Sequence, residues 1–133
     1  MSDVRSLVFS ALTGDSALNT LGINANTLWA AGSLDAPLDG PFAVLRWGPT
    51  TRGFGPVNSA TLAIYVHDQG ASYDAINAIL KRMRAVMLAL CASGTAANWI
   101  IDVEWLGDSG ELDDQQYKTL MRSADFRVVA NTL

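Results

Sequence analysis

Six carboxylates between residues 102 and 114 are the first groups in this sequence that could do chemistry. They are Asp102, Glu104, Asp108, Glu111, Asp113 and Asp114. Asp102 and Glu104 lie two apart in the alternating stretch "WIIDVEWL", which places both on one strand face, roughly 7 Å apart. Two carboxylates at such a separation can serve a hydrolase. The same spacing occurs on any half-solvated strand, which is the interpretation we favour.

The later carboxylates could bind Ca²⁺, because that ion prefers oxygen ligands. The stretch from Asp108 to Asp114 lacks the regular alternation and the closing glutamate of an EF-hand loop. We therefore interpret it as a solvated acidic loop before a final strand, and we predict no metal site and no cofactor.

The remaining reactive residues do not form a catalytic group. His67 and Asp68 are neighbours on a predicted strand, so their side chains point to opposite faces and we interpret His67 as an ordinary strand-end histidine. With one histidine and one cysteine, a zinc site built on these ligands is excluded. We expect Cys91 to be a small buried apolar residue. Nucleophile elbows, phosphate-binding loops and dinucleotide fingerprints are absent from the sequence, so we predict no enzyme activity.

The composition indicates a globular protein that does not grip nucleic acid. The chain has 133 residues, half of them apolar and 17% charged, with a net charge of −4. Its nine basic residues are too few to neutralise a phosphate backbone. No run reaches the roughly 18 apolar residues of a membrane span. Since the N-terminus also lacks the pattern of a signal peptide, we expect assembly in a cytoplasm and no membrane partner.

The hydrophobic pattern predicts a single α+β domain over residues 1–133. We expect helices over 3–13 and 72–90 with a short helical turn between residues 15 and 22, and strands over 41–48, 60–68, 99–106 and 117–130. The expected order is α-α-β-β-α-β-β, a largely antiparallel four-stranded sheet with helices on one face. Gly and Pro residues at about 48–58 predict a mobile loop or the tip of a long hairpin. Aromatic residues near turns, such as Trp29, Trp47 and Phe54, are typical of interfaces.

The order of segments resembles a family of phage proteins. "PFAVLRWG" precedes a Gly/Pro-rich insert, "TLAIYVHDQGASYDAINAILKRMRAVM", an acidic turn and "RSADFRVV". This order resembles the tail-terminator (minor tail or tail-completion) proteins of phages with long non-contractile tails. The matching positions are Pro41–Phe42, Tyr65–Asp68, Tyr73–Asn77, Arg122, Phe126, Arg127 and Val128. The resemblance spans nearly the whole chain, and each motif in it is short.

The resemblance implies a structural virion protein at the head-proximal end of the tail. Such a protein forms a ring, usually a homohexamer, that caps the tail tube, ends its polymerisation and joins the head connector. DNA passes through the ring without specific binding. Implied partners are therefore further copies of the chain, the tail-tube protein and the head–tail connector protein.

The resemblance also suggests roles for three groups of residues. We expect the tail tube to contact Thr50, Thr51, Arg52, Gly53, Phe54 and Gly55. We expect Asp102, Glu104, Asp108, Glu111, Asp113 and Asp114 to line the channel or its rim. We expect neighbouring subunits to meet at Lys81, Arg82, Arg84, Arg122, Asp125 and Arg127.

Three alternatives stay open on the sequence alone. One is another neck or head-completion connector protein, since the motifs do not separate it from a terminator. The second is a small enzyme that uses Asp102 and Glu104. The third is a protein that binds a ligand between helix and sheet, although no polar cluster is evident to orient one.

Overall fold

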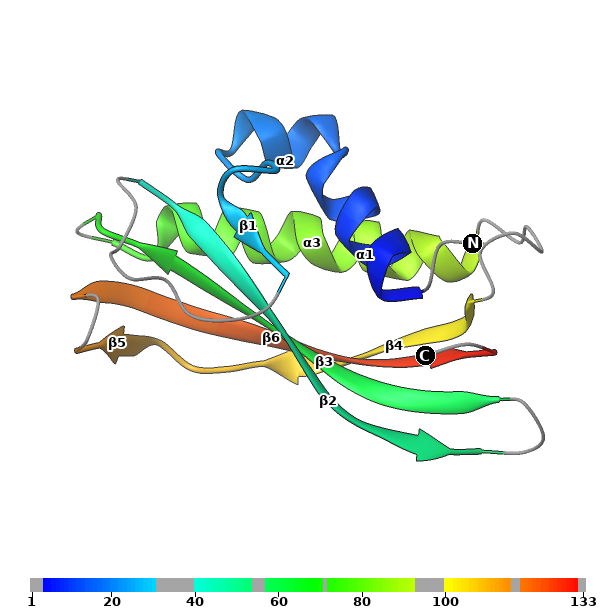
Figure 1. The fold of residues 1–133 in the computed structure, drawn as a ribbon. Helices are drawn as coiled ribbons and strands as arrows, with labels where there is room; N and C mark the ends of the chain where they lie inside the picture. The colour runs from blue at the N-terminus through cyan, green and yellow to red at the C-terminus, as the bar shows by residue number, and fades with distance from the viewer. Residues whose placement is uncertain are drawn as a thin grey trace.

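A layer of helices covers one face of a single β-sheet (Figure 1). The computed structural model describes residues 4–30, 40–53, 57–70, 72–92, 100–115 and 118–131. Its elements are α1 (Val4–Thr13), α2 (Ser16–Thr20), β1 (Leu28–Trp29), β2 (Phe42–Arg52), β3 (Asn58–Asp68), α3 (Asp74–Ala92), β4 (Ile100–Asp108), β5 (Leu112–Asp114) and β6 (Thr119–Ala130). No helix in these ranges is long and apolar enough to cross a membrane.

The sheet is built around β6, the last strand in the sequence. The strand order is β1-β2-β3-β6-β4, and β5 also pairs with β6. Strands β2, β3, β6 and β4 are each antiparallel to their neighbours, whereas β1 runs parallel to β2. Strands β4 and β5 follow the same edge of β6 one after the other.

The expected α+β class is confirmed, but the expected count of four strands is wrong because the sheet has six. The two additional strands, β1 and β5, have two and three residues, too few to show an alternating pattern. They change the order of elements to α-α-β-β-β-α-β-β-β.

The core lies between α3 and the helix-covered face of the sheet. Helix α3 buries Ile76, Ile79, Leu80, Met83 and Met87, as its apolar stripe predicts. Helix α1 adds buried side chains at a spacing of four: Val4, Val8 and Leu12. The strands supply alternate residues, of which Leu62, Ile64 and Phe126 are fully buried. Burying one such side chain stabilises the fold by roughly 1.5–3 kcal/mol.

Three irregularities interrupt the strand pairing. The register shifts between Trp47 and Thr50 of β2, and in β4 between Ile100 and Asp102 and between Trp105 and Gly107. Each shift inserts one extra residue and changes which side chains face the helices. Strict alternation along "WIIDVEWL" would place Ile101 on the same face as the buried Val103, whereas the first shift in β4 brings Ile100 against the core. Trp99 and the side chain of Ile101 lie outside the described residues.

The Gly/Pro-rich segment lies largely in the β2–β3 hairpin. Residues 48–52 belong to β2, and Thr50, Thr51 and Arg52 pair with Ala60, Ser59 and Asn58 of β3. The amide of Gly53 donates to the carbonyl of Val57 at 2.8 Å and closes the pairing. Residues 54–56 lie outside the described ranges.

Candidate functional site

The six carboxylates lie along one edge of the sheet. Asp102, Glu104 and Asp108 are on β4, Asp113 and Asp114 are on β5, and Glu111 lies between the two strands. Five are exposed and Asp114 is half-buried. Residues 100–114 contain no Lys or Arg. We call this stretch the acidic edge.

Arg122 of β6 holds together the break between β4 and β5. Its Nε and Nη2 donate to the carbonyl of Ser109 at 3.0 and 2.9 Å, and its Nη1 donates to Oδ1 of Asn77 on α3 at 2.6 Å. The amides of Ser109 and Ser123 donate to the Ser123 carbonyl and the Ser109 hydroxyl. These bonds are all within one chain, so Arg122 fixes the shape of the acidic edge.

The acidic edge does not have the geometry of a metal site. Within the described ranges, no group of three or more His, Cys, Asp or Glu side chains is placed to hold a metal ion. Glu104 forms an exposed ion pair with Arg127 of β6, while Asp102 is exposed further along β4.

Apolar side chains are also exposed along this edge. The exposed fractions of Trp105, Leu106 and Leu112 are 39%, 49% and 44%. The guanidinium of Arg84 on α3 lies 4.4 Å from the centre of the Trp105 ring, and the Trp105 Nε1 donates to Oδ1 of Asp108 at 3.0 Å. Exposed apolar groups bordered by charges are common at protein–protein contacts.

The opposite edge of the sheet is basic. Strand β2 carries Arg46 and Arg52, both exposed, and no acidic residue. Strand β1 pairs only with Ala43 and Val44, so within the described ranges no strand covers the outer side of β2 from Leu45 to Arg52. We call this stretch the basic edge. Arg5 of α1 lies beside it, 5.3 Å from the centre of the Trp47 ring.

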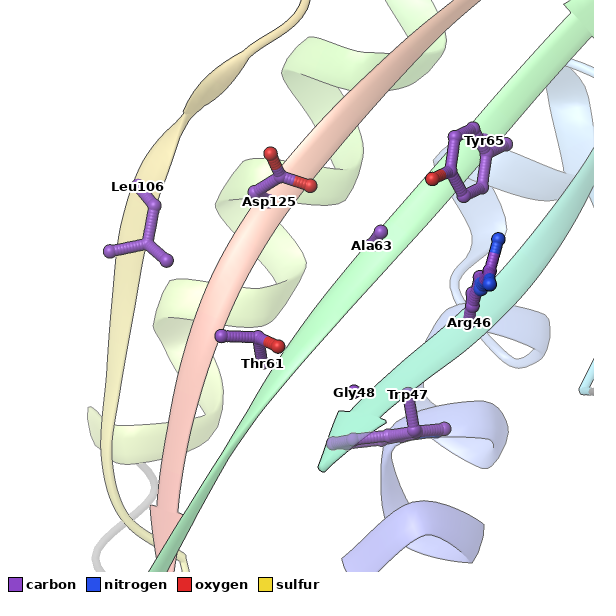
Figure 2. A pocket seen from close by; sticks show the side chains of 8 residues that line it. All are labelled: Arg46, Trp47, Gly48, Thr61, Ala63, Tyr65, Leu106 and Asp125. Atoms are coloured by element: carbon purple, nitrogen blue, oxygen red, sulfur yellow. The ribbon is translucent and has the colours of Figure 1, made fainter. Parts of the chain in front are cut away.

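The face of the sheet away from the helices has a shallow hollow of about 350 Å³ (Figure 2). Gly48 and Ala63 leave space at its floor, because they carry little or no side chain. Around it lie Arg46, Trp47, Thr61, Tyr65, Leu106 and Asp125. A Cβ on Gly48 would approach within 2.3 Å of the Thr61 hydroxyl oxygen, so glycine is needed for this close strand packing. The hollow therefore combines both signs of charge with an aromatic ring and does not select one charge.

The three basic residues of α3 have separate environments. Lys81 is exposed. Arg82 donates two hydrogen bonds to Asp15, the residue that caps α2, and Arg84 covers Trp105. The described contacts of Arg82 and Arg84 are thus within one chain, and a role at a subunit interface stays a prediction for all three residues.

His67 is in a buried cluster that the sequence pattern did not predict. Its exposed fraction is 4%, and its ring stacks on Phe42 with centroids 4.7 Å apart and planes 2° apart. Its Nδ1 lies 2.9 Å from the Thr119 hydroxyl oxygen and 3.9 Å from Oδ2 of Asp114. Burial lowers the pKa of His67, and the carboxylate of Asp114 opposes that shift. The cluster joins β2 and β3 to the last residue of β5 and the first residue of β6.

Some predicted residues cannot be placed. Phe54 and Gly55 lie outside the described ranges, as does the side chain of Cys91. The other predicted tube-contact residues, Thr50 to Gly53, are exposed at the end of the β2–β3 hairpin. Asp125 is exposed on the helix-free face, beside the hollow in Figure 2.

Comparisons with known proteins identify the fold. By sequence, the chain matches no protein-family model and no curated protein. By structure, it is similar to a chain in a solved structure described as the virion of a native gene transfer agent particle. The TM-score is 0.73, and the likeness covers 96% of this chain and 94% of that chain at 15% sequence identity. At that identity the likeness shows a shared fold over nearly the full length of both chains.

Proposed function

We propose that the protein is a structural component of a phage-like virion and that it forms the ring that terminates the tail tube. The observation that carries the proposal is the shared fold with a chain of a gene transfer agent virion over 96% of this chain. That likeness supports a structural virion component, whereas the terminator ring is supported by the segment order in the sequence, which resembles tail-terminator proteins.

The charge distribution suits a channel for DNA. Six carboxylates lie along the acidic edge. Arg127 pairs with one of them, Glu104, and Arg84 lies beside Trp105, so the edge keeps an excess of negative charge. A negative surface repels phosphates and lets a genome pass without adhering. In the proposed ring, the acidic edge contributes to the channel or its rim, and the protein makes no specific contact with DNA.

The end of the β2–β3 hairpin is the proposed contact with the tail tube. Thr50, Thr51, Arg52 and Gly53 are exposed there, and strand pairing holds the first three in an extended conformation. A paired hairpin loses little conformational freedom when a partner binds. The head connector would then meet a different face of the ring.

The proposal is tested by removing the protein from the virus that encodes it and measuring tails by electron microscopy. A terminator is required to stop polymerisation, so its loss gives over-long tubes or unjoined tails. Normal tails together with leaking heads would contradict the proposal and support a head-side neck protein instead.

The hairpin contact is tested in the same virus with a Thr51→Glu and Arg52→Glu double variant. Both side chains are exposed, so the fold is retained while the proposed contact surface changes charge. The matched control is Ser16→Glu, which adds negative charge on the exposed side of α2. Normal tail lengths in the double variant would reject the hairpin contact. If Asp102→Asn and Glu104→Gln leave tail assembly unchanged and a hydrolytic activity is found, the enzyme alternative would gain support.

A further inference from the structure

We infer that copies of this chain join head to tail by pairing the acidic edge of one copy with the basic edge of the next. Strand β4 of one copy would lie antiparallel to β2 of its neighbour, and the sheet would continue from copy to copy. The inference rests on the proposed function and narrows it. The carboxylates of β4 would lie at the boundary with the neighbouring subunit, so Glu111, Asp113 and Asp114 would be the ones left for the channel or its rim. Strand β2 would meet the neighbour through its backbone groups, which leaves the exposed side chains at the end of the hairpin for the tail tube.

Strand direction is the first argument. Because β2, β3, β6 and β4 alternate in direction, β4 runs opposite to β2. A second copy placed beside β4, with its helices on the same side, therefore presents its β2 in the antiparallel orientation. The alternation would then continue across the boundary without a change of face.

Within the described ranges, no strand pairs with the outer side of β4 or with the outer side of β2 from Leu45 to Arg52. On β2, the Gly53 amide points toward β3, so alternation directs the amides of Thr50 and Arg52 toward the outer side. On β4, every paired residue has its partner on β6, on one side of the strand. Unprotected strand edges of this kind are templates for pairing with another chain.

Charge selects this pairing over its alternatives. Two acidic edges brought together would oppose the carboxylates of Asp102 and Asp108 with their own copies, and two basic edges would oppose Arg46 and Arg52. Like charges that face each other across strands are destabilising. Only the acidic-to-basic contact is complementary, and a contact between two unlike surfaces propagates around a ring, whereas a two-fold contact stops at a dimer.

The existing register shows which residues would lie side by side. Across the sheet, Thr51 lies in one row with Ser59, Val129 and Asp102, and Arg46 lies in one row with Ala63, Asp125 and Gly107. A neighbour placed without stagger therefore sets its Thr51 beside Asp102 and its Arg46 beside Gly107. Arg52 and Asp108 each lie one residue further along their strands and point to the other face of the sheet. The complementarity is therefore between the net charges of the two edges and not between facing side chains. Exposed Leu106 lies between these two contacts and would be covered by the neighbour.

The test uses two variants that cannot pair with themselves but can pair with each other. Arg46→Glu with Arg52→Glu changes the charge of β2 from +2 to −2, and Asp102→Arg with Asp108→Arg changes the charge of β4 from −3 to +1, because Glu104 remains. All four side chains are exposed. Self-association of the purified wild type, each variant and their equal mixture is measured by light scattering and native mass spectrometry, in low and high salt.

We expect the wild type to associate and each double variant alone to associate at least about tenfold more weakly. The equal mixture should regain assemblies with an even number of chains that alternate between the two variants. High salt should weaken the wild-type assembly, because salt at 1 M screens the electrostatic attraction between exposed charges beyond roughly 3 Å. Ser16→Glu adds one negative charge on the exposed side of α2, away from both edges, and should associate like the wild type.

Three results would overturn the inference. The first is a wild type that stays monomeric up to about 1 mM. The second is a double variant that associates as tightly as the wild type, and the third is an equal mixture of the two double variants that stays dissociated although both are folded. Circular dichroism establishes folding. If a double variant fails to fold, the single exposed changes Arg52→Glu and Asp102→Arg replace it in the same mixing test. Tail length decides the proposed function separately, since a ring could cap tubes through other contacts, and paired edges could occur outside a tail.

Discussion

Arg82 of α3 and Asp15 at the start of α2 form a two-point ion pair across 67 residues of sequence. Arg82 Nε donates to Oδ2 at 2.9 Å, and Arg82 Nη2 donates to Oδ1 at 2.7 Å. The same Oδ2 accepts a hydrogen bond from the backbone amide of Leu18 at 3.0 Å and so caps the N-terminus of α2. One carboxylate therefore both begins a five-residue helix and attaches it to the long helix of the core.

Asp15→Ala should reduce the free energy of unfolding by about 1 kcal/mol, mainly through loss of the helix cap. The measurement is urea denaturation at pH 7. Asp15→Asn is the matched variant, because an amide oxygen can still cap the helix while the charge is removed. The free energy of unfolding of Asp15→Asn should lie between those of the wild type and Asp15→Ala. If Asp15→Asn loses as much stability as Asp15→Ala, the ion pair, and not the helix cap, carries the stability.

The contribution of Asp15 should depend on pH. The hydrogen bond from Arg82 lowers the pKa of Asp15 below its ordinary value of 3.8, and the Leu18 amide acts in the same direction. A carboxylate with a lowered folded-state pKa contributes stability above the unfolded-state pKa and loses it as the pH falls through the folded-state pKa. The difference in unfolding free energy between wild type and Asp15→Asn should therefore narrow below pH 3.8. A constant difference from pH 7 to pH 2 would contradict this prediction.

His67 should make the protein less stable in mild acid. Burial lowers the pKa of His67 below 6.5, so the unfolded chain takes up a proton at a higher pH than the folded chain. Since the unfolded state then binds more protons, the free energy of unfolding falls as the pH decreases from 6.5 to the folded-state pKa. Denaturation of the wild type and of His67→Gln at several pH values checks this. In His67→Gln, the free energy of unfolding should decrease less between pH 6.5 and the folded-state pKa than in the wild type. An unchanged pH dependence would show that other groups cause it.

Arg122→Ala should loosen the junction between β4 and β5. The change removes two bonds to the Ser109 carbonyl and one to Asn77, and we expect a loss of about 1–3 kcal/mol in the free energy of unfolding. Hydrogen exchange should also accelerate at the Ser109 and Ser123 amides. Arg122→Lys keeps the charge but cannot reproduce the forked contact, so it should exchange faster than wild type as well. Unchanged exchange in both variants would contradict the role of Arg122.

Gly48→Ala should destabilise the sheet because the new Cβ meets the Thr61 side chain at 2.3 Å. We expect a cost of about 1–3 kcal/mol from overpacking. Thr61→Ala removes the obstructing hydroxyl, so the double variant should recover much of the loss. A double-mutant cycle measured by urea denaturation tests this, and strictly additive costs would show that the two positions are not coupled.

The sequence predicted the elements that carry long patterns. Helix α3 was predictable because its apolar residues form a wide stripe, and β3 was predictable because Leu62, Ile64 and Val66 alternate with polar or smaller residues. Strands β1 and β5 were not, because two or three residues show no period and β5 consists of Leu112 and two aspartates. The pairing of β4 and β5 along one edge of β6 depends on contacts between distant segments, which no local pattern records.

The candidate site shows the same difference between features that are local in the sequence, which were predicted, and contacts between distant segments, which were not. The acidic edge was visible as six carboxylates close in sequence, but the ion pair of Arg82 with Asp15 and the bonds of Arg122 to Asn77 were not. For Arg122 a signal did exist: it lies an even number of residues from Phe126 on one strand, so it shares the helix-covered face with that core residue. The burial of His67 had no such signal, because Phe42 and Thr119 reach it from other strands.

The central place of β6 affects how the chain can fold as it is synthesised. Strand β6 lies between β3 and β4, yet the ribosome makes it after every other strand of the sheet. Until it emerges, the β2–β3 hairpin and β4 have no bridge between them, and the inner edges of β3 and β4 stay open to other nascent chains. Sheet formation must therefore wait until residues 119–130 have left the exit tunnel, and the chain is exposed to premature aggregation during that interval.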